Sequence, residues 1–219
     1  MALSHSPSII TNGLVLCLDA ANTKPYPGSG TTWTDLSGNG NNGTLVNSVG
    51  YDSANGGSLS LNGSSDYVRI PNASISKNCS ICFWFKDNNP GAWSDLFTFQ
   101  TGSDGTASRV EKHGGIAYQY NWYQGGFANG TVLFNHLGTN FDYICLVFDA
   151  QNATCYQNAV QTAQSSSSNF GSASFIDFGK RISIYNWNGN IAQVTIYNRP
   201  LTPSEVTQNY NALKGRYGL

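Results

Sequence analysis

The sequence has few charged residues, and this scarcity excludes several classes of partner. Lys, Arg, Asp and Glu make up 11% of the 219 residues, and the formal net charge is -1 at pH 7. An average globular protein carries about 25% charged residues. Proteins that bind nucleic acid usually concentrate basic residues on one face, so we expect neither DNA, RNA nor an anionic membrane as a partner. Asn, Gln, Ser, Thr and 24 glycines take the polar positions instead.

The sequence also lacks the segments that direct a chain into or across a membrane. Its first residues, MALSHSPSIITNG, contain no basic stretch followed by a long apolar run, so no secretory signal is expected. No apolar run approaches the roughly 20 residues that span a bilayer. We therefore expect synthesis and folding in a cytosol.

The cysteines are odd in number and form no recognisable metal or disulfide framework. A reducing cytosol would keep them as thiols, and we interpret them as small buried apolar residues. Cys79 and Cys82 form a C-x-x-C, but residues three apart on a strand point to opposite faces, and no second pair accompanies them. The five are Cys17, Cys79, Cys82, Cys145 and Cys155.

Glutamate is scarce, which bears on enzymatic activity. Glycoside hydrolysis needs two carboxylates about 5 to 9.5 Å apart. The two glutamates are Glu111, which has no acidic neighbour two residues away, and Glu205, which we assign to a helix cap. No G-x-S-x-G elbow occurs either. We predict no catalytic residue, although Asp pairs distant in sequence could still converge in space.

What the sequence does contain is a repeated strand pattern. Short alternating apolar segments separated by Asn and Gly clusters are typical of an antiparallel sandwich or barrel. Segments 80–86 and 142–149 are apolar at nearly every position, as in central strands covered on both sides. We predict hairpins between 59–61 and 67–70 and around 186–190. No linker divides the pattern, so one domain should span 1–219, with residues 1–12 as an N-terminal arm.

One helix is predicted near the C-terminus, over residues 202–214. Thr202 is a candidate N-cap, Pro203 suits the first helical position, and Glu205 completes a capping box. Gly215 is placed to end the helix in a left-handed conformation. We expect this helix to dock on the edge of the sandwich.

Three stretches together resemble the laminin-G-like, concanavalin-A-like jelly-roll family. They are similar to that family's hairpin, its paired inner strands, and its closing strand with a capped helix. The resemblance extends over almost the whole chain, and it implies an all-β jelly-roll sandwich of two antiparallel sheets with one short C-terminal helix. The stretches are LSLNGSSDYVRIP, FDYICLVFDAQNATCYQNAV and NGNIAQVTIYNRPLTPSEV.

A narrower resemblance concerns the two ends of the chain. The opening, SIITNGLVLCLDAANTKPYPGSGTTWTDLSGNGNNGTLVN, and the ending, VTQNYNALKGRYGL, are similar to virion structural proteins of tailed bacteriophages that carry this module. This implies a non-enzymatic virion surface protein, a capsid decoration or a fibre or tail component, made in the host cytoplasm. Its expected partners are capsid or tail proteins, copies of itself and a host surface glycan. The alternatives are a lectin module unrelated to a virion, and a glycoside hydrolase or lyase.

The stretch WTDLSGNGNNGTLV, residues 33–46, matches part of a calcium-binding loop. Asp35 fits the first position, but Val46 stands where a bidentate Glu should complete the coordination. Many members of the resembled family hold calcium through acidic residues in a Gly-x-Ile-Asp-Glu-Val stretch, and Ala192 and Gln193 take those positions here. We predict no metal and no cofactor, and interpret the stretch as an Asn-Gly turn in which Asp35 bonds nearby amides.

Aromatic residues gather in segments that we interpret as loops. An aromatic ring can cover the apolar C–H face of a sugar while Asn and Gln amides bond its hydroxyls, so a neutral site can bind a neutral glycan. The alternative is that Tyr118, Tyr120 and Trp122 alternate along a strand and face the core. The candidate carbohydrate-binding residues are Trp93, Tyr120, Trp122, Tyr123 and Trp187.

Overall fold

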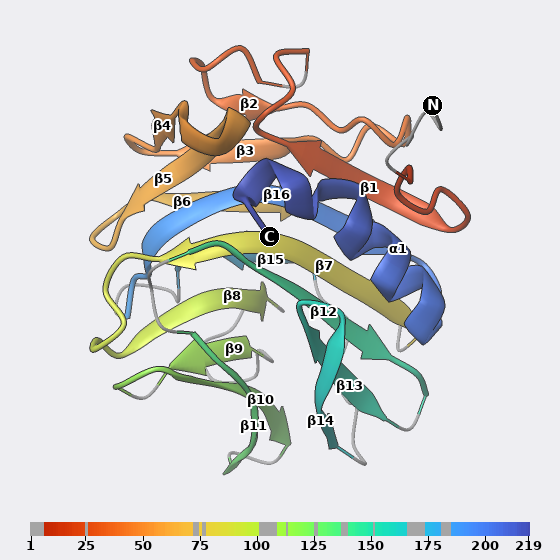
Figure 1. Ribbon diagram of the computed structural model, residues 1–219. Helices are drawn as coiled ribbons and strands as arrows, with labels where there is room; N and C mark the ends of the chain where they lie inside the picture. The colour runs from red at the N-terminus through yellow and green to blue at the C-terminus, as the bar shows by residue number, and fades with distance from the viewer. Residues whose placement is uncertain are drawn as a thin grey trace.

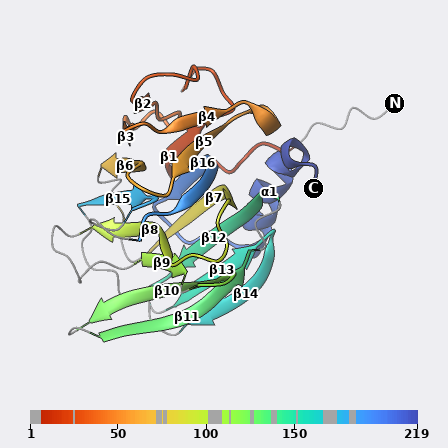
Figure 2. The same ribbon diagram turned by 90° about the vertical axis from the view of Figure 1, so that its left-hand side faces the viewer.

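The computed structural model describes residues 7–24, 26–71, 75, 78–100, 109–112, 114–124, 127–136, 140–150, 152–165, 174–180 and 185–219, with the backbone alone for 120–124 and 127–132. These residues form two antiparallel β-sheets packed face to face, and one α-helix lies near the C-terminus (Figures 1 and 2). The predicted all-β, two-sheet sandwich with one C-terminal helix is confirmed.

The first sheet, sheet A, has eight strands within the described residues. From one edge to the other they are β14 (Val160–Ser165), β13 (Ala153–Gln157), β12 (Asp142–Phe148), β7 (Cys79–Asp87), β16 (Asn188–Tyr197), β5 (Ser58–Asn62) and β4 (Gly50–Asp52), while β1 (Leu14–Asp19) pairs with the second half of β16. The two nearly continuous apolar segments of the sequence become β7 and β12, which are neighbours in the middle of this sheet.

The second sheet, sheet B, also has eight strands within the described residues. Their order is β11 (Phe127–Asn135), β10 (Ala117–Gln124), β9 (Arg109–Lys112), β8 (Ser94–Gln100), β15 (Phe175–Phe178), β6 (Tyr67–Pro71), β3 (Gly43–Val46) and β2 (Thr32–Trp33). A 3-10 turn, η1 (Ala54–Gly56), lies between β4 and β5.

Two apolar layers cover the two faces of sheet A. Between the sheets, Phe83 of β7 packs edge-on against Phe97 of β8 and Phe178 of β15, with ring centroids 5.7 and 5.9 Å apart. On the outer face, the neighbouring Trp84 belongs to a separate cluster. Strand alternation sends adjacent residues to opposite faces, which is why β7 is apolar at almost every position.

The helix, α1 (Pro203–Leu213), follows the predicted cap closely. The Thr202 hydroxyl accepts from the Glu205 N–H at 3.3 Å, and the Glu205 carboxylate accepts from the Thr202 N–H at 2.8 Å. Two details differ from the prediction. Gly215 lies inside a following 3-10 turn, η2 (Lys214–Tyr217), and Gly218 (φ 73°) is the left-handed residue that ends it. The helix also covers the outer face of sheet A, not its edge, because Trp84 presents a broad apolar surface there.

Both predicted hairpins are wrong. β5 lies in sheet A and β6 in sheet B, so the connection between them carries the chain from one sheet to the other. Asn62 redirects the chain there, because its Oδ1 accepts from the N–H groups of three following residues. Around 186–190, the predicted turn residues Asn188, Gly189 and Asn190 belong to β16 itself, and residues 181–184 lie outside the described part.

The stretch around Asp35 is a hydrogen-bonded turn, as interpreted from the sequence. Asp35 Oδ1 accepts from the N–H groups of Cys17 at 2.9 Å and Ser37 at 2.8 Å, and Oδ2 accepts from the Ser37 hydroxyl at 2.7 Å and the Asn41 N–H at 3.0 Å. Gly38 (φ 85°) and Gly40 (φ 77°) are left-handed. The carboxylate is therefore fully engaged by the turn.

All five cysteines are buried thiols, as predicted. Cys79 faces the layer between the sheets and Cys82 faces the layer under the helix, so the C-x-x-C pair points in opposite directions. Among the described residues, the structure has no helix of the length and apolar character needed to cross a bilayer.

Candidate functional site

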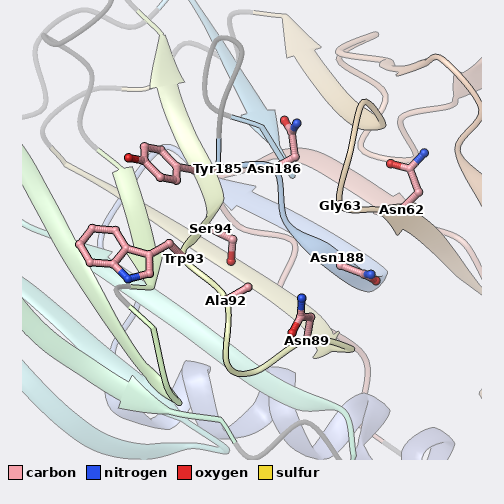
Figure 3. Close-up of a pocket in the computed structure, with 9 residues that line it drawn as sticks. All are labelled: Asn62, Gly63, Asn89, Ala92, Trp93, Ser94, Tyr185, Asn186 and Asn188. Atoms are coloured by element: carbon pink, nitrogen blue, oxygen red, sulfur yellow. The ribbon is translucent and has the colours of Figure 1, made fainter.

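A pocket of ≈ 360 Å³ lies where three connecting segments meet at one end of the sandwich. The segments are the turn after β5, the β7–β8 loop and the residues that lead into β16, and all three come together on the left of Figure 1. Nine of the described residues line the pocket: Asn62, Gly63, Asn89, Ala92, Trp93, Ser94, Tyr185, Asn186 and Asn188 (Figure 3).

The pocket has an aromatic side and an amide side. In Figure 3 the rings of Trp93 and Tyr185 lie on one side, and the amides of Asn89 and Asn188 lie on the other. The two rings are 6.2 Å apart between centroids, with an interplanar angle of 37°. Trp93 is 55% exposed and Tyr185 is 40% exposed. Large rings usually bury most of their surface, so two exposed rings at one pocket indicate a surface available to a ligand.

Tyr185 is held in an unusual backbone conformation. Its φ is +64°, which is rare for a residue with a bulky side chain. Its carbonyl accepts from the Asp95 N–H at 2.9 Å, and Asn186 forms an isolated bridge with Asp95. Backbone strain of this kind persists where surrounding contacts enforce it, and it concentrates at binding sites.

The amides of the pocket divide into two groups. Asn62 Oδ1 accepts from backbone N–H groups of its own turn, and Asn186 Nδ2 donates to the Ser64 carbonyl. By contrast, the side-chain amides of Asn89 and Asn188 have no hydrogen-bond partner among the described residues. Each free amide offers two donors and one acceptor, so together they can bond adjacent hydroxyls of a ligand.

Of the lining residues in the described part of the chain, none carries a charge at neutral pH. Next to the lining residue Asn89, the Lys112 ammonium contacts Asp87, and both of these side chains are almost completely buried. The described lining is therefore an electrically neutral surface of rings and amides, with neither a cation to bind an acid nor a carboxylate to bind a base among those residues.

The structure divides the residues that the sequence proposed as sugar-binding. Trp93 lies in the pocket. Tyr120, Trp122 and Tyr123 lie on β10, a strand and not the predicted loop, and their side chains are outside the described part. Tyr118, on the same strand, is completely buried, as the core-facing alternative predicted.

Trp187 does not line the pocket, which corrects its assignment. It is 0% exposed, and its Nε1 donates to the Tyr118 hydroxyl at 3.0 Å. Gly189 makes room for the inward-facing indole, because a Cβ there would lie 2.3 Å from the Trp187 ring. The sequence pointed to the right segment, YNWNG, but Tyr185 and Asn188 are the residues that face the pocket.

Two carboxylates that are distant in sequence also converge, on sheet B. Asp95 of β8 pairs directly with Glu111 of β9, a neighbour that spacing along one strand could not show. Arg109 lies between them, with Nε 2.6 Å from Glu111 Oε2 and 3.3 Å from Asp95 Oδ1. All three are at most 5% exposed.

Comparison with known proteins identifies the fold. A family model described as the concanavalin A-like lectin/glucanases superfamily matches residues 62–207, more than half of the chain. A search of curated proteins finds no match to the sequence. Domain 4 of AbnA, a GH43 extracellular arabinanase from Geobacillus stearothermophilus solved with arabinotriose, is similar with a TM-score of 0.71 and 18% identity, over 90% of this chain and 98% of that domain.

Two further solved structures share the fold. The botulinum neurotoxin type G receptor binding domain has a TM-score of 0.68 and 19% identity, over 91% of this chain and 51% of that one. Trypanosoma rangeli sialidase, solved with the inhibitor DANA, has a TM-score of 0.72 and 14% identity, over 94% of this chain and 35% of that one. The chain thus spans about half of the toxin domain and about a third of the sialidase.

Proposed function

Because this chain belongs to the concanavalin A-like lectin/glucanases superfamily, we propose that it is a non-enzymatic carbohydrate-binding module with its ligand in the Trp93–Tyr185 pocket. One observation carries the proposal. The exposed large hydrophobic side chains among the described residues include two aromatic rings, and both line this pocket. The neighbouring arabinanase domain with arabinotriose supports the same ligand class.

The two sides of the pocket match the two kinds of surface on a sugar. A pyranose or furanose ring has apolar C–H faces, which the indole of Trp93 can cover. Its hydroxyls both donate and accept, as the free amides of Asn89 and Asn188 do. A pocket of ≈ 360 Å³ lies near the lower end of the sizes seen for small ligands, so it suits a short stretch of glycan.

The ligand that fits best is neutral. An acidic sugar would place its carboxylate against amides and rings, with no cation among the described lining residues, and the lost hydration would not be recovered. We therefore propose that the module binds uncharged oligosaccharides in preference to those with uronic or sialic acid.

The carboxylates of sheet B support a binding module over a hydrolase. A glycosidase acid must gain and lose a proton at the substrate. Asp95 and Glu111 are almost completely buried, and both contact the same guanidinium, that of Arg109, so neither carboxylate is placed to exchange a proton with a substrate at the surface.

A glycan array with neutral oligosaccharides, including arabinotriose, and acidic ones tests the proposal. We expect signals confined to neutral members, and Trp93→Ala should weaken them about tenfold, which corresponds to ~1.4 kcal/mol. Val160→Ala, at an exposed apolar residue outside the pocket, should leave binding unchanged. Silence of the wild type across the array, or full binding by Trp93→Ala, would overturn the proposal.

We further propose that the module is displayed on a bacteriophage virion as a capsid decoration or a fibre or tail component. The support is the resemblance of residues 8–47 and 206–219 to virion structural proteins, together with the weakly charged composition. Capsid or tail proteins and copies of the chain are then its partners. An antibody against the protein should label intact virions of the encoding phage; label confined to unassembled protein would contradict this role.

A further inference from the structure

A buried ion pair joins the two sheets directly behind the amide side of the pocket. Asp87 ends β7 of sheet A, and Lys112 ends β9 of sheet B. Their side chains are 1% and 0% exposed, and Lys112 Nζ contacts Asp87 Oδ2. Lysine is almost never fully buried unless it is paired, because removing an ammonium from water is costly.

Both members of the pair also hold the backbone of Asn89. The Asn89 N–H donates to Asp87 Oδ1 at 2.9 Å, and the Asn89 carbonyl accepts from Lys112 Nζ at 2.7 Å. The two polar backbone groups of one pocket residue are thus fixed by the two opposite charges. Asn89 sits in an exposed loop, where the backbone would otherwise bond to water.

Buried side chains outside the pocket lining hold the ion pair in place. The Tyr118 hydroxyl donates to Asp87 Oδ2 at 2.6 Å, and Trp187 Nε1 donates to that hydroxyl at 3.0 Å. The Asp87 N–H donates to His136 Nε2 at 3.0 Å. This network gives Trp187 a role behind the site, although its ring never reaches the surface.

We propose that Asp87 and Lys112 are positioning residues. By fixing the backbone of Asn89, they hold its side-chain amide opposite the rings of Trp93 and Tyr185. The inference rests on the proposed carbohydrate-binding function. A buried ion pair contributes little net stability compared with an apolar pair of the same shape, so its specific contacts to Asn89 explain its presence better than stability does. Burial lowers the pKa of Lys112 below its ordinary value, and the contact with Asp87 offsets part of that lowering.

The test is a double variant, Asp87→Asn with Lys112→Met, which removes both charges and leaves none unpaired. We expect it to fold and to bind arabinotriose, or the strongest neutral member of the array, about tenfold more weakly. Asn89→Ala should weaken binding in the wild type but add nothing in the double variant, because the amide is no longer held in place. If the ion pair acted on stability alone, Asn89→Ala would weaken binding by the same factor in the wild type and in the Asp87/Lys112 variant.

A matched control replaces the ion pair between Asp19 and Arg216, which lies under the C-terminal turn, away from the pocket. Asp19→Asn with Arg216→Met should leave oligosaccharide affinity unchanged. If this control weakens binding as much as the Asp87/Lys112 variant does, or if Asn89→Ala remains fully additive, the positioning role is wrong.

Hydrogen exchange at the Asn89 backbone N–H provides a readout without ligand. We expect protection in the wild type and exchange at least about tenfold faster in the Asp87/Lys112 variant. If the Asn89 N–H exchanges equally fast in the wild type and the variant, the positioning role is wrong, while the proposed glycan binding still stands if the wild type binds glycans. A wild type that binds nothing on the array overturns the proposed function, and with it the role of the pair in binding, whatever the exchange shows.

Discussion

At the scale of single residues, Gly114 lies directly against the Trp93 ring. Gly114 (φ 71°) and its neighbour Gly115 (φ 85°) are both left-handed, a conformation that costs a residue with a Cβ roughly 1–2 kcal/mol. A Cβ on Gly114 would lie 3.2 Å from Trp93 Nε1, whereas one on Gly115 meets nothing within 4 Å. The two positions therefore share a backbone requirement but differ in their contact with the pocket.

Alanine substitutions separate these two effects. We expect Gly114→Ala and Gly115→Ala to lower the free energy of unfolding by a similar amount, roughly 1–2 kcal/mol each. Only Gly114→Ala should weaken binding of the array-selected neutral oligosaccharide, by about fivefold, or ~1 kcal/mol, because it displaces the indole. Chemical denaturation and calorimetric titration measure the two quantities. Equal affinities for the two variants would show that Gly114 does not support the ring.

A second prediction concerns Cys82 and Cys145. They are direct partners across β7 and β12, with sulfur atoms 2.7 Å apart. Directly opposite antiparallel residues have the Cα separation that a disulfide requires. Burial raises the pKa of Cys145, so its reactive thiolate is scarce and oxidation should be slow.

We expect diamide, a small two-electron oxidant, to take up two protons and two electrons from these thiols and leave one Cys82–Cys145 disulfide. Peptide mapping by mass spectrometry identifies the cross-link, and Cys82→Ser should abolish it. A cross-link formed instead by Cys17, Cys79 or Cys155 would contradict the assignment.

The pocket shows how far single-residue reasoning from sequence extends. Trp93 and Trp187 both stand in Asn- and Gly-rich segments, and composition could not distinguish them. Trp187 is buried because it directly precedes β16 and its ring packs inward over Gly189, whereas Trp93 is exposed because it ends a surface loop. Tyr185 gave no separate signal, since a positive φ is invisible in the residue type.

At the scale of the element, α1 depends on an ion pair built onto its cap. Arg199 donates to both carboxylate oxygens of Glu205, at 2.9 and 2.6 Å. The hydrogen-bonded guanidinium lowers the pKa of Glu205 from its ordinary value of 4.5 to about 2. Because the folded pKa is depressed, the stabilising contribution is fully present above the unfolded value and is lost as the pH falls from about 4.5 towards 2.

Glu205→Gln isolates this contribution, since glutamine preserves the capping box but has no charge. We expect the variant to be less stable than the wild type at pH 7, and the difference in melting temperature to shrink as the pH falls from about 4.5 towards 2. Thermal denaturation across this range measures it. A difference that stays constant with pH would show that the charge of Glu205 does not stabilise the helix.

Local and non-local signals explain which elements the sequence predicted. The helix was predicted because its cap, Pro203 and apolar spacing are all encoded within a dozen residues. The strands were identifiable by alternation, but their partners were not. The turn after β5 has the composition of a hairpin loop and instead crosses between sheets, because β5 finds a partner in β16, more than a hundred residues later.

At the scale of the whole molecule, sheet A is a wall between two apolar layers of different extent. The layer between the sheets contains side chains from strands throughout the chain, and Phe83 of β7 is one of them. The outer layer depends on α1 and η2, where Trp84 stacks on Tyr217 at 4.3 Å and on Tyr210 at 5.7 Å. The order of the strands in the two sheets decides which residues meet in each layer, and it also brings Asp87 next to Lys112. Because these residues are far apart in the sequence, local sequence patterns could not predict that they meet.

This arrangement predicts that neighbouring residues of β7 control different parts of the molecule. Phe83→Ala should lower the global free energy of unfolding by about 3–5 kcal/mol, because it leaves a cavity between the sheets. Trp84→Ala should also be destabilising, but its larger effect should be on local opening of the helix, because α1 is attached to the body through that outer layer.

Native-state hydrogen exchange distinguishes the two variants. In Trp84→Ala, amides of α1 should exchange much faster while those of β8 and β15 keep their protection relative to global stability. In Phe83→Ala, amides of both sheets and of the helix should lose protection together. If α1 and sheet B respond alike in Trp84→Ala, the helix unfolds only with the sandwich, and the outer layer is part of one cooperative core.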